Sequence, residues 1–184
     1  MTGDGPARSP LERRADDLAL IGAGLLPFLV QVDLRVDPSH AARSPFPLPL
    51  DPNTAWHDPN NSVLWLGPDE WLILGSGEPE DELVRDLEAD FGGVPHSIVD
   101  VSANRVCLAL IGDDRFDLLS HVCSLDFDAR LWGPERCAQT MLGRAPAIIF
   151  ERTGTTPILV RPSFAEYLVD LLLEVRKLIG DMRA

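Results

Sequence analysis

The sequence predicts an α+β fold, in which an antiparallel or mixed sheet carries helices on one face. Three patterns lead to this prediction. Two pairs of apolar segments are each joined by a short turn, which is typical of β-hairpins. Segment Phe28–Val36 alternates apolar residues with a period of two, as a half-buried strand does. Residues 78–90 and 163–179 instead repeat apolar residues at helical spacing, so single helices are expected between the hairpins.

In the first half of the chain, turns and prolines separate the expected elements. The interval from residue 38 to residue 61 is rich in proline, which lacks the N–H that a central strand needs, so we expect an extended surface connection. The turn Gly67-Pro68-Asp69 separates two apolar runs and predicts a hairpin. The elements expected here are a helix at 13–21, a strand at 28–36, hairpin strands at 62–66 and 70–74, and a helix at 78–90.

In the second half, Val106–Ile111 is apolar on both faces, which predicts a central strand. Ser163 and Glu166 predict a capping box at the start of the last helix, and Gly180 predicts its end. The strand-helix-strand spacing from about residue 97 to residue 179 is typical of a ferredoxin-like unit. The elements expected here are strands at 98–101 and 106–111, a helix at 113–122, a hairpin at 147–151 and 157–160, and a helix at 163–179.

The domain organisation follows from chain length and from the composition of the N-terminus. At 184 residues the chain is long enough for one compact domain with its own core. Residues 1–12 contain glycine and proline, so we expect a flexible N-terminal arm or an arm that docks elsewhere. Residues 13–184 are expected to form a single domain, with possible subdomains at 13–95 and 96–184.

Charge and hydropathy exclude several classes of partner. The formal net charge of −13 disfavours nucleic acid and anionic membrane surfaces. The longest apolar stretch, residues 18–32, is interrupted by glycine and proline and is shorter than the roughly 20 residues that span a membrane. The residues before it are acidic on balance, unlike a secretory signal, so we expect a cytoplasmic protein.

The sequence contains no pattern that predicts a catalytic residue, a metal ligand or a cofactor site in this chain. Leu18–Gly24 begins like a dinucleotide-binding loop, but Pro27 stands where the third glycine is required. The four histidines are scattered, without the spacing of metal ligands. Cys107, Cys123 and Cys137 lie far apart in the sequence and are expected to be reduced thiols.

Five residues are candidates for a binding surface. Asp100 lies in an apolar strand and would be costly to bury unpaired, so Arg105 is its expected partner across the intervening turn. We expect this pair to be structural or interfacial, with catalysis as the lesser alternative. Trp65 and Trp71 are expected in the core, with a protein interface as the alternative, because tryptophan is a frequent interface anchor. Asp69, in the turn between them, completes the interface candidates together with Arg105.

Seven short motifs follow one another along nearly the whole chain. They are Ser9-Pro10-Leu11, Asn53-Thr54, residues 64–74, Val99-Asp100-Val101-Ser102 with Arg105, Cys123-Ser124-Leu125-Asp126, Cys137-Ala138-Gln139-Thr140 and residues 161–168. In this order they resemble the gamma subunit of heterotetrameric sarcosine oxidase. Two positions in turns depart from the family pattern: Ser124 stands where proline is expected, and Ala103-Asn104 stands where Asp-Gly is frequent.

The resemblance implies a fold similar to the folate-binding module of the glycine-cleavage T-protein. It also implies membership in a complex that oxidises sarcosine to glycine, reduces oxygen to hydrogen peroxide and transfers the one-carbon unit to tetrahydrofolate. FAD, FMN, NAD and tetrahydrofolate are then expected in the alpha and beta (and delta) partner subunits, and this chain is an accessory subunit. The alternative is a stand-alone folate-binding protein of the T-protein type, with aminomethyl transfer or repair activity, in which Asp100 would contact the pterin.

Overall fold

A computed structural model gives the fold of the chain and describes residues 9–27, 29–76 and 80–183. Residues 1–8 of the predicted arm, Phe28 and residues 77–79 lie outside this description. The strands are β1 (Ala23–Leu25), β2 (Val30–Val36), β3 (Ala55–His57), β4 (Asn61–Gly67), β5 (Glu70–Gly75), β6 (His96–Asp100), β7 (Val106–Ile111), β8 (Cys137–Leu142), β9 (Ala145–Phe150) and β10 (Thr155–Val160). The helices are α1 (Ala15–Leu20), α2 (Glu80–Phe91), α3 (Arg115–Ser120) and α4 (Pro162–Arg183), with short 3-10 helices at Pro10–Arg14, Pro38–Arg43 and Ser102–Asn104.

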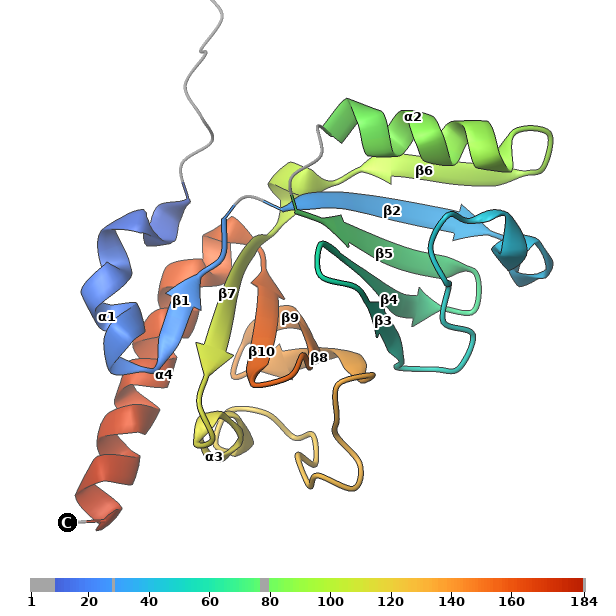
Figure 1. Cartoon of the computed structure of the whole chain (residues 1–184). Coiled ribbons are helices and arrows are strands. Elements are labelled where there is room, and N and C mark those ends of the chain that lie inside the picture. The colour runs from blue at the N-terminus through green and yellow to red at the C-terminus, as the bar shows by residue number, and fades with distance from the viewer. Residues whose placement is uncertain (1–8, 28, 77–79, 184) are drawn as a thin grey trace, which may run out of the picture.

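Within the described residues, the strands form two five-stranded sheets in which every strand pairing is antiparallel. Sheet A has the strand order β1-β7-β10-β9-β8, and sheet B has the order β3-β4-β5-β2-β6 (Figure 1). The chain crosses between the sheets after β1, where it leaves sheet A for sheet B, and again after β6, where it returns. We call these two segments the crossovers.

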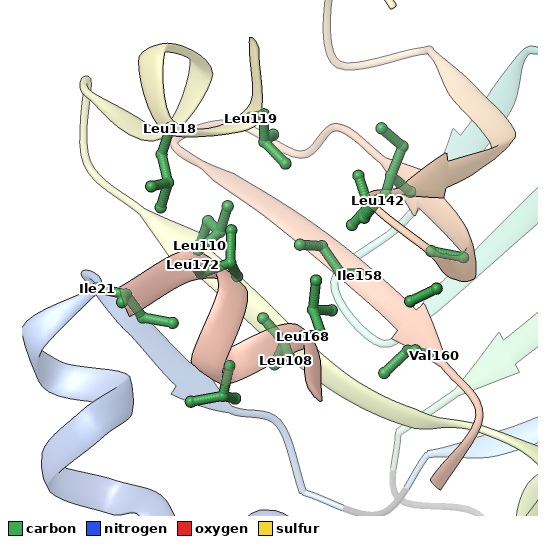
Figure 2. Close-up of a cluster of buried hydrophobic side chains, with 14 of the residues drawn as sticks. Ile21, Leu108, Leu110, Leu118, Leu119, Leu142, Ile158, Val160, Leu168 and Leu172 are labelled. Atoms are coloured by element: carbon green, nitrogen blue, oxygen red, sulfur yellow. The ribbon is translucent and has the colours of Figure 1, made fainter. Parts of the chain in front are cut away.

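Helices cover the outer face of each sheet. Leu108 and Leu110 of β7 share a buried cluster with Leu168 and Leu172 of α4, and α1 and α3 contribute further side chains to it (Figure 2). On sheet B, the alternate residues Val32 and Leu34 of β2 pack in a second cluster with Leu83, Leu87 and Phe91 of α2. Each cluster follows from strand alternation, because every second side chain of a strand points to the same face.

The inner faces of the two sheets pack against each other. Leu64 and Leu72 of sheet B share a third cluster with Ile148 and Leu159 of sheet A. The layers are therefore helices, sheet A, sheet B and helix. The predicted α+β class is confirmed, but the structure contains two sheets where the sequence predicted one. Apolar residues on both faces of a strand indicate burial on both sides, whether the covering layer is a helix or a second sheet.

The second half of the chain differs from the predicted ferredoxin-like unit. Its element order is β7-α3-β8-β9-β10-α4, which has three strands between the helices where a ferredoxin-like unit has two. The additional strand is β8, which the sequence analysis missed because the exposed or half-buried Gln139 and Thr140 interrupt its apolar pattern. Helix α4 also continues through Gly180 to Arg183, since one glycine costs only about 1 kcal/mol within a long helix.

The N-terminal boundary of the folded domain lies earlier than predicted. Ser9 and Glu12 form a capping box for the 3-10 helix Pro10–Arg14, and Leu11 is fully buried in the cluster beneath α4. Residues 9–12 therefore belong to the domain and are not part of a flexible arm. The expected subdomain boundary at 95/96 does not separate the sheets, because β1 lies in sheet A and β6 lies in sheet B.

Candidate functional site

Trp71, an interface candidate from the sequence, is a core residue. Its side chain is fully buried in the cluster beneath α2. Its Nε1–H donates a hydrogen bond of 2.7 Å to the carbonyl oxygen of Pro49, in the proline-rich connection. Trp71 therefore ties that connection to sheet B, and it is not exposed to a partner. This corrects the interface alternative for Trp71 and supports its expected core role.

Trp65 and Asp69 lie at the surface end of the β4–β5 hairpin. Trp65 is half-buried and stands opposite Trp71 across the strand pair, and Asp69 is exposed in the turn. Arg35 Nη2 lies 3.9 Å from Asp69 Oδ1 and 2.6 Å from Glu70 Oε2. The structure thus places Trp65 and Asp69 where another protein could reach them.

Asp100 does not pair with Arg105, contrary to the sequence-based expectation. Its carboxylate is exposed and its Oδ1 accepts hydrogen bonds from the N–H (2.8 Å) and Oγ–H (2.6 Å) of Ser102. Among the described residues, no carboxylate oxygen lies within 4.0 Å of the Arg105 guanidinium. Asp100 is paired with Val32 in the β2–β6 ladder, so its side chain lies on the face of sheet B that is covered by α2. Arg105 lies farther along the chain, where the backbone has left sheet B and approaches sheet A, and the two side chains therefore do not meet.

Arg105 is half-buried at the second crossover, just before β7. Burial lowers the pKa of its guanidinium, and the positive charge of Arg161 lowers it further. The carboxylates of Asp33 and Glu70 act in the opposite direction and do not outweigh these two effects. Arg105 is therefore a charged group that burial and a neighbouring cation both destabilise.

Gln31 lies beside Arg105 and is almost completely buried, with 2% of its surface exposed. Its Nε2 donates to the carbonyl oxygens of Ser102 (3.2 Å) and Arg105 (2.7 Å), and its backbone N–H donates to Ser102 Oγ (2.9 Å). These bonds fix the orientation of the amide, because a flipped amide would place its oxygen against two carbonyl oxygens. Within the described residues Gln31 Oε1 has no donor, which costs about 1–3 kcal/mol for a buried acceptor.

Gln31 and Arg105 line one cavity of about 250 Å³, whose walls include residues of both crossovers. We call it the crossover cavity. Its walls are mostly apolar, and Glu12 and Ser9 lie at its edge. The remaining lining residues are Pro10, Leu25, Leu26, Pro27, Leu29, Ser102, Ala103, Val106, Cys107 and Pro162.

A second hollow of about 320 Å³ adjoins Arg105 and contains Arg161, together with residues of β8 and β9. No carboxylate oxygen of the described residues lies within 4.0 Å of the Arg161 guanidinium either. Nearby on sheet B, burial and the carboxylate of Glu70 raise the pKa of Asp33. Arg105 therefore lines both hollows and Arg161 lines the second, whereas the amide oxygen of Gln31 is enclosed by protein atoms.

Sequence reasoning found Arg105 but missed Gln31 and Arg161. Gln31 carried a weak signal, because it is a polar residue between Val30 and Val32 in a strand whose first three residues are all buried. Arg161 belongs to a motif that was noted for its resemblance to the family, but nothing in the local sequence places it near Arg105. The crossovers bring these residues together, and their pairing is a property of the tertiary structure.

The three cysteines are free thiols, as expected. Cys107 and Cys137 are buried, and burial raises the pKa of each thiol to about 12, so neither is a thiolate at neutral pH. Within the described ranges, no group of three or more His, Cys, Asp or Glu residues is arranged to hold a metal ion. The helices of the described part of the chain include none that is both long and apolar enough to cross a membrane.

The fold also occurs in known structures. The chain superposes on a chain of "Heterotetrameric Sarcosine Oxidase from Corynebacterium sp. U-96 in complex with pyrrole 2-carboxylate" with a TM-score of 0.85 and 29% sequence identity, over 94% of this chain and 96% of that one. It also superposes on the glycine cleavage system aminomethyltransferase T from Bartonella henselae, with a TM-score of 0.62 and 14% identity over 89% of this chain and 49% of that one. The second match shows a T-protein-like fold and nothing beyond the fold.

Sequence comparison agrees with the first structural match. A sarcosine oxidase gamma subunit from Arthrobacter sp. is 33% identical over 185 aligned residues, which cover 91% of this chain and 88% of the relative. The gamma subunit from Corynebacterium sp. (strain U-96) is 36% identical over 115 residues, or 61% of this chain and 55% of the relative. Residues 36–176, which include Arg105 and Arg161 but not Gln31, match the family model described as "Sarcosine oxidase, gamma subunit family", and the chain is accordingly a member of that family.

Proposed function

We propose that this chain is the accessory gamma subunit of a heterotetrameric sarcosine oxidase. The observation that carries the proposal is the match over nearly the full length of both chains, with a TM-score of 0.85, to a chain of such an enzyme. A chain that keeps the whole fold of a subunit also keeps the surface area needed to pack against the other subunits. Its role is then to support assembly, while the partner subunits carry out the chemistry.

In this proposal the assembled enzyme oxidises the N-methyl group of sarcosine by two electrons and reduces oxygen to hydrogen peroxide. The one-carbon unit passes to tetrahydrofolate, and glycine remains. The partners are the alpha, beta and delta subunits, which would hold FAD, FMN, NAD and tetrahydrofolate, and this chain would supply no catalytic residue. The proposed location of the assembly is the cytoplasm.

The exposed end of the β4–β5 hairpin is our proposed contact with a partner subunit. Half-buried Trp65 offers apolar surface there, and Asp69 offers a charge beside it. A half-buried tryptophan next to a polar rim is a common arrangement at protein interfaces. Trp71 is excluded from this contact because it is fully buried.

The assembly is tested by co-expressing the chain with the genes for the three other subunits of its source organism. We expect the chain to elute in size-exclusion chromatography together with flavin absorbance and with sarcosine-dependent hydrogen peroxide formation. Omitting the chain should lower the yield or the thermal stability of the flavin-containing complex. If the other subunits assemble with unchanged stability and activity while this chain elutes alone, the proposal is wrong.

A charge reversal tests the proposed contact. Asp69→Arg should weaken co-elution with the partner subunits, because it reverses a charge at the hairpin turn. Asp90→Arg is the matched control, since Asp90 is also exposed but lies at the end of α2, away from the hairpin. Equal retention of both variants in the complex would place the contact elsewhere on the chain.

The alternative of a stand-alone folate-binding protein depended on Asp100. The exposed Asp100 carboxylate is held by Ser102, and Asp100 is not among the residues that line the crossover cavity. Saturable tetrahydrofolate binding by the isolated chain that is lost in Asp100→Ala would restore this alternative. We expect no such binding.

A further inference from the structure

We propose that the second hollow, which Arg105 and Arg161 line, receives an aspartate or glutamate side chain of a partner subunit. The two guanidinium groups would hold that carboxylate, and the apolar residues beside them would pack against the protein surface that carries it. This inference rests on the proposed function, because it needs the assembled enzyme. It concerns sheet A, whereas the hairpin contact proposed above lies on sheet B.

The strand register places the two arginines beside each other. Val106 of β7 pairs with Val160 of β10 in an antiparallel ladder. Arg105 precedes Val106 and Arg161 follows Val160, so the same register sets the two arginines opposite each other with their side chains on one face. That face is the inner face of sheet A, because Cys107, two residues after Arg105, belongs to the cluster between the sheets.

The hollow lies where sheet B stops covering the inner face of sheet A. Met141 of β8 and Pro146 of β9 pair with each other and line the hollow together with Arg161, and all three are exposed. Gln139, two residues before Met141, still contacts sheet B, because its Nε2 donates to the carbonyl oxygen of Leu66 at 2.8 Å. The hollow therefore adjoins the β4–β5 hairpin, and the two proposed contacts form one continuous surface.

The positive charge of the hollow is uncompensated. The chain has 29 acidic and 16 basic residues, so carboxylates are abundant. Among the described residues, however, neither Arg105 nor Arg161 has a carboxylate oxygen within 4.0 Å. Asp33 and Glu70 act on Arg105 more weakly than Arg161 does. Two like charges that an acidic protein leaves together repel each other, and an external carboxylate would relieve that repulsion. The arginines that do have such a carboxylate are Arg14, Arg35, Arg115, Arg130 and Arg176.

The surroundings favour a protein side chain over a free anion. The Met141 side chain is 47% exposed, and Pro146 lies beside it in the next strand. Methionine and arginine are both enriched at protein interfaces. Free phosphate would pair with the guanidinium groups but would leave Met141 and Pro146 in contact with water. An acidic residue on a partner surface brings a carboxylate, which guanidinium binds through two parallel hydrogen bonds, and also covers the apolar side chains.

Zero-length cross-linking tests the contact directly in the assembled enzyme. Lys177 is the single lysine of the sequence, so Arg161→Lys keeps the charge and adds one amine at the hollow. Arg161 is exposed, so the variant should fold and assemble. A carbodiimide should join this amine to a carboxylate in direct contact, with loss of water. Mass spectrometry of the peptides should then find an amide bond from position 161 to an aspartate or glutamate of a partner subunit. Lys177, in the same molecules, reports the background coupling.

Charge reversal measures how much the contact contributes to assembly. Arg161→Glu should weaken the binding of the chain to the other subunits at least about tenfold, because repulsion replaces an ion pair. Lys177→Glu is the matched control, since Lys177 is also exposed but lies toward the far end of α4, and it should change the affinity by less than about twofold. Mass photometry of the diluted complex gives the dissociation constants. Circular dichroism checks that each variant is folded.

Two outcomes would overturn this inference and leave the proposed function intact. In the first, the assembled enzyme contains Arg161→Lys, but its new amine couples to no carboxylate or only to one of its own chain. In the second, Arg161→Glu and Lys177→Glu dissociate from the complex at the same concentration as the wild type. If the wild-type chain does not co-elute with the flavin-containing subunits, the proposed function itself is wrong, and the inference about the hollow is wrong with it.

Discussion

Arg115 and Glu151 form a buried ion pair between the first turn of α3 and the end of β9, with 2.6 Å between Arg115 Nη2 and Glu151 Oε1. Their side chains are only 10% and 4% exposed. Thr156 completes the arrangement, because its Oγ1 accepts from Arg115 Nε at 3.1 Å and donates to Glu151 Oε2 at 2.5 Å. The guanidinium also donates to the Gly112 carbonyl oxygen at 2.7 Å. The three side chains therefore satisfy one another where water has little access.

Removal of one charge from this pair should destabilise the protein strongly. Glu151→Gln keeps the shape of the side chain but leaves Arg115 as a buried, uncompensated cation, so we expect a loss of about 3–5 kcal/mol in the free energy of unfolding. Urea denaturation measures it. The control is Asp128→Asn, because the Asp128–Arg130 pair is exposed to solvent and its loss should have a much smaller effect. Similar losses in both variants would show that Arg115 finds another partner.

Gly143, in the turn between β8 and β9, should not tolerate a side chain. Its φ is +56°, and a Cβ atom there would lie 2.5 Å from Leu171 Cδ2 and 2.6 Å from Tyr167 Oη. Gly143→Ala should therefore lower the free energy of unfolding by about 1–3 kcal/mol through overpacking, in addition to backbone strain.

Gly154→Ala is the control for Gly143→Ala. Gly154 also has a positive φ, of +80°, but its Cβ position meets no atom of the described residues within 4 Å. Its substitution should cost the backbone strain alone. If the two variants unfold at the same urea concentration, α4 moves away from the turn without cost.

His57 should make the stability of the protein depend on pH. Its ring stacks on Phe150, with 5.6 Å between the ring centroids. Neither ring nitrogen has a partner at full hydrogen-bond geometry among the described residues, although the carbonyl groups of Pro134 and Glu151 lie close enough to interact weakly with the ring. Burial lowers the pKa of His57, as does the charge of Arg152, and the carbonyl groups of Pro134 and Glu151 only partly oppose them. The folded protein therefore binds this proton less readily than the unfolded chain does.

His57 destabilises the folded protein only at acidic pH. Above pH 6.5, the ordinary pKa of histidine, His57 is neutral in both states and has no effect on stability. As the pH falls below 6.5, the unfolded chain is protonated first and the free energy of unfolding decreases. Urea denaturation between pH 7.5 and pH 5 should show a smaller decrease for His57→Phe than for the wild type. His96, whose pKa Glu88 raises, acts in the opposite direction in both proteins and does not affect the comparison.

Trp71→Phe should loosen the proline-rich connection without unfolding the sheets. The substitution removes the hydrogen bond from Trp71 Nε1 to the Pro49 carbonyl oxygen and leaves a small gap under α2. We expect a loss of about 1–3 kcal/mol in the free energy of unfolding and faster proteolysis between residues 38 and 54. Trp65→Phe is the matched control, because its ring makes no hydrogen bond in the described residues. Unchanged proteolysis in Trp71→Phe would show that the other contacts suffice to hold the connection.

The sequence predicted most elements but not how they are combined. Val106–Ile111 was identified as a central strand because both faces are apolar, and it lies inside sheet A as expected. The same pattern could not show that one face meets α4 and the other meets sheet B. Strand β8 was missed because an edge strand with polar Gln139 and Thr140 lacks the apolar alternation of a central strand. A local sequence pattern shows which residues are buried. Whether a helix or the second sheet covers them depends on how distant strands pair.

The candidate site shows the same limit. Arg105 was paired with Asp100 because they are close in sequence, but the chain turns between sheets in that interval, and Ser102 takes the carboxylate. The neighbours that act on Arg105 instead are Arg161 and Asp33, from distant parts of the sequence. A pattern search over short windows is unable to find such a cluster, because its members share no spacing.

The exchange of strands between the two sheets also affects the order in which the protein can fold during synthesis. Strand β1 pairs with β7, and β7 pairs with β10. Residues 23–25 therefore cannot pair in sheet A until the second half of the chain has been synthesised. At roughly 5–20 residues per second, the ribosome needs several seconds to supply β7. During that time the backbone groups of β1 that later pair with β7 have no strand partner.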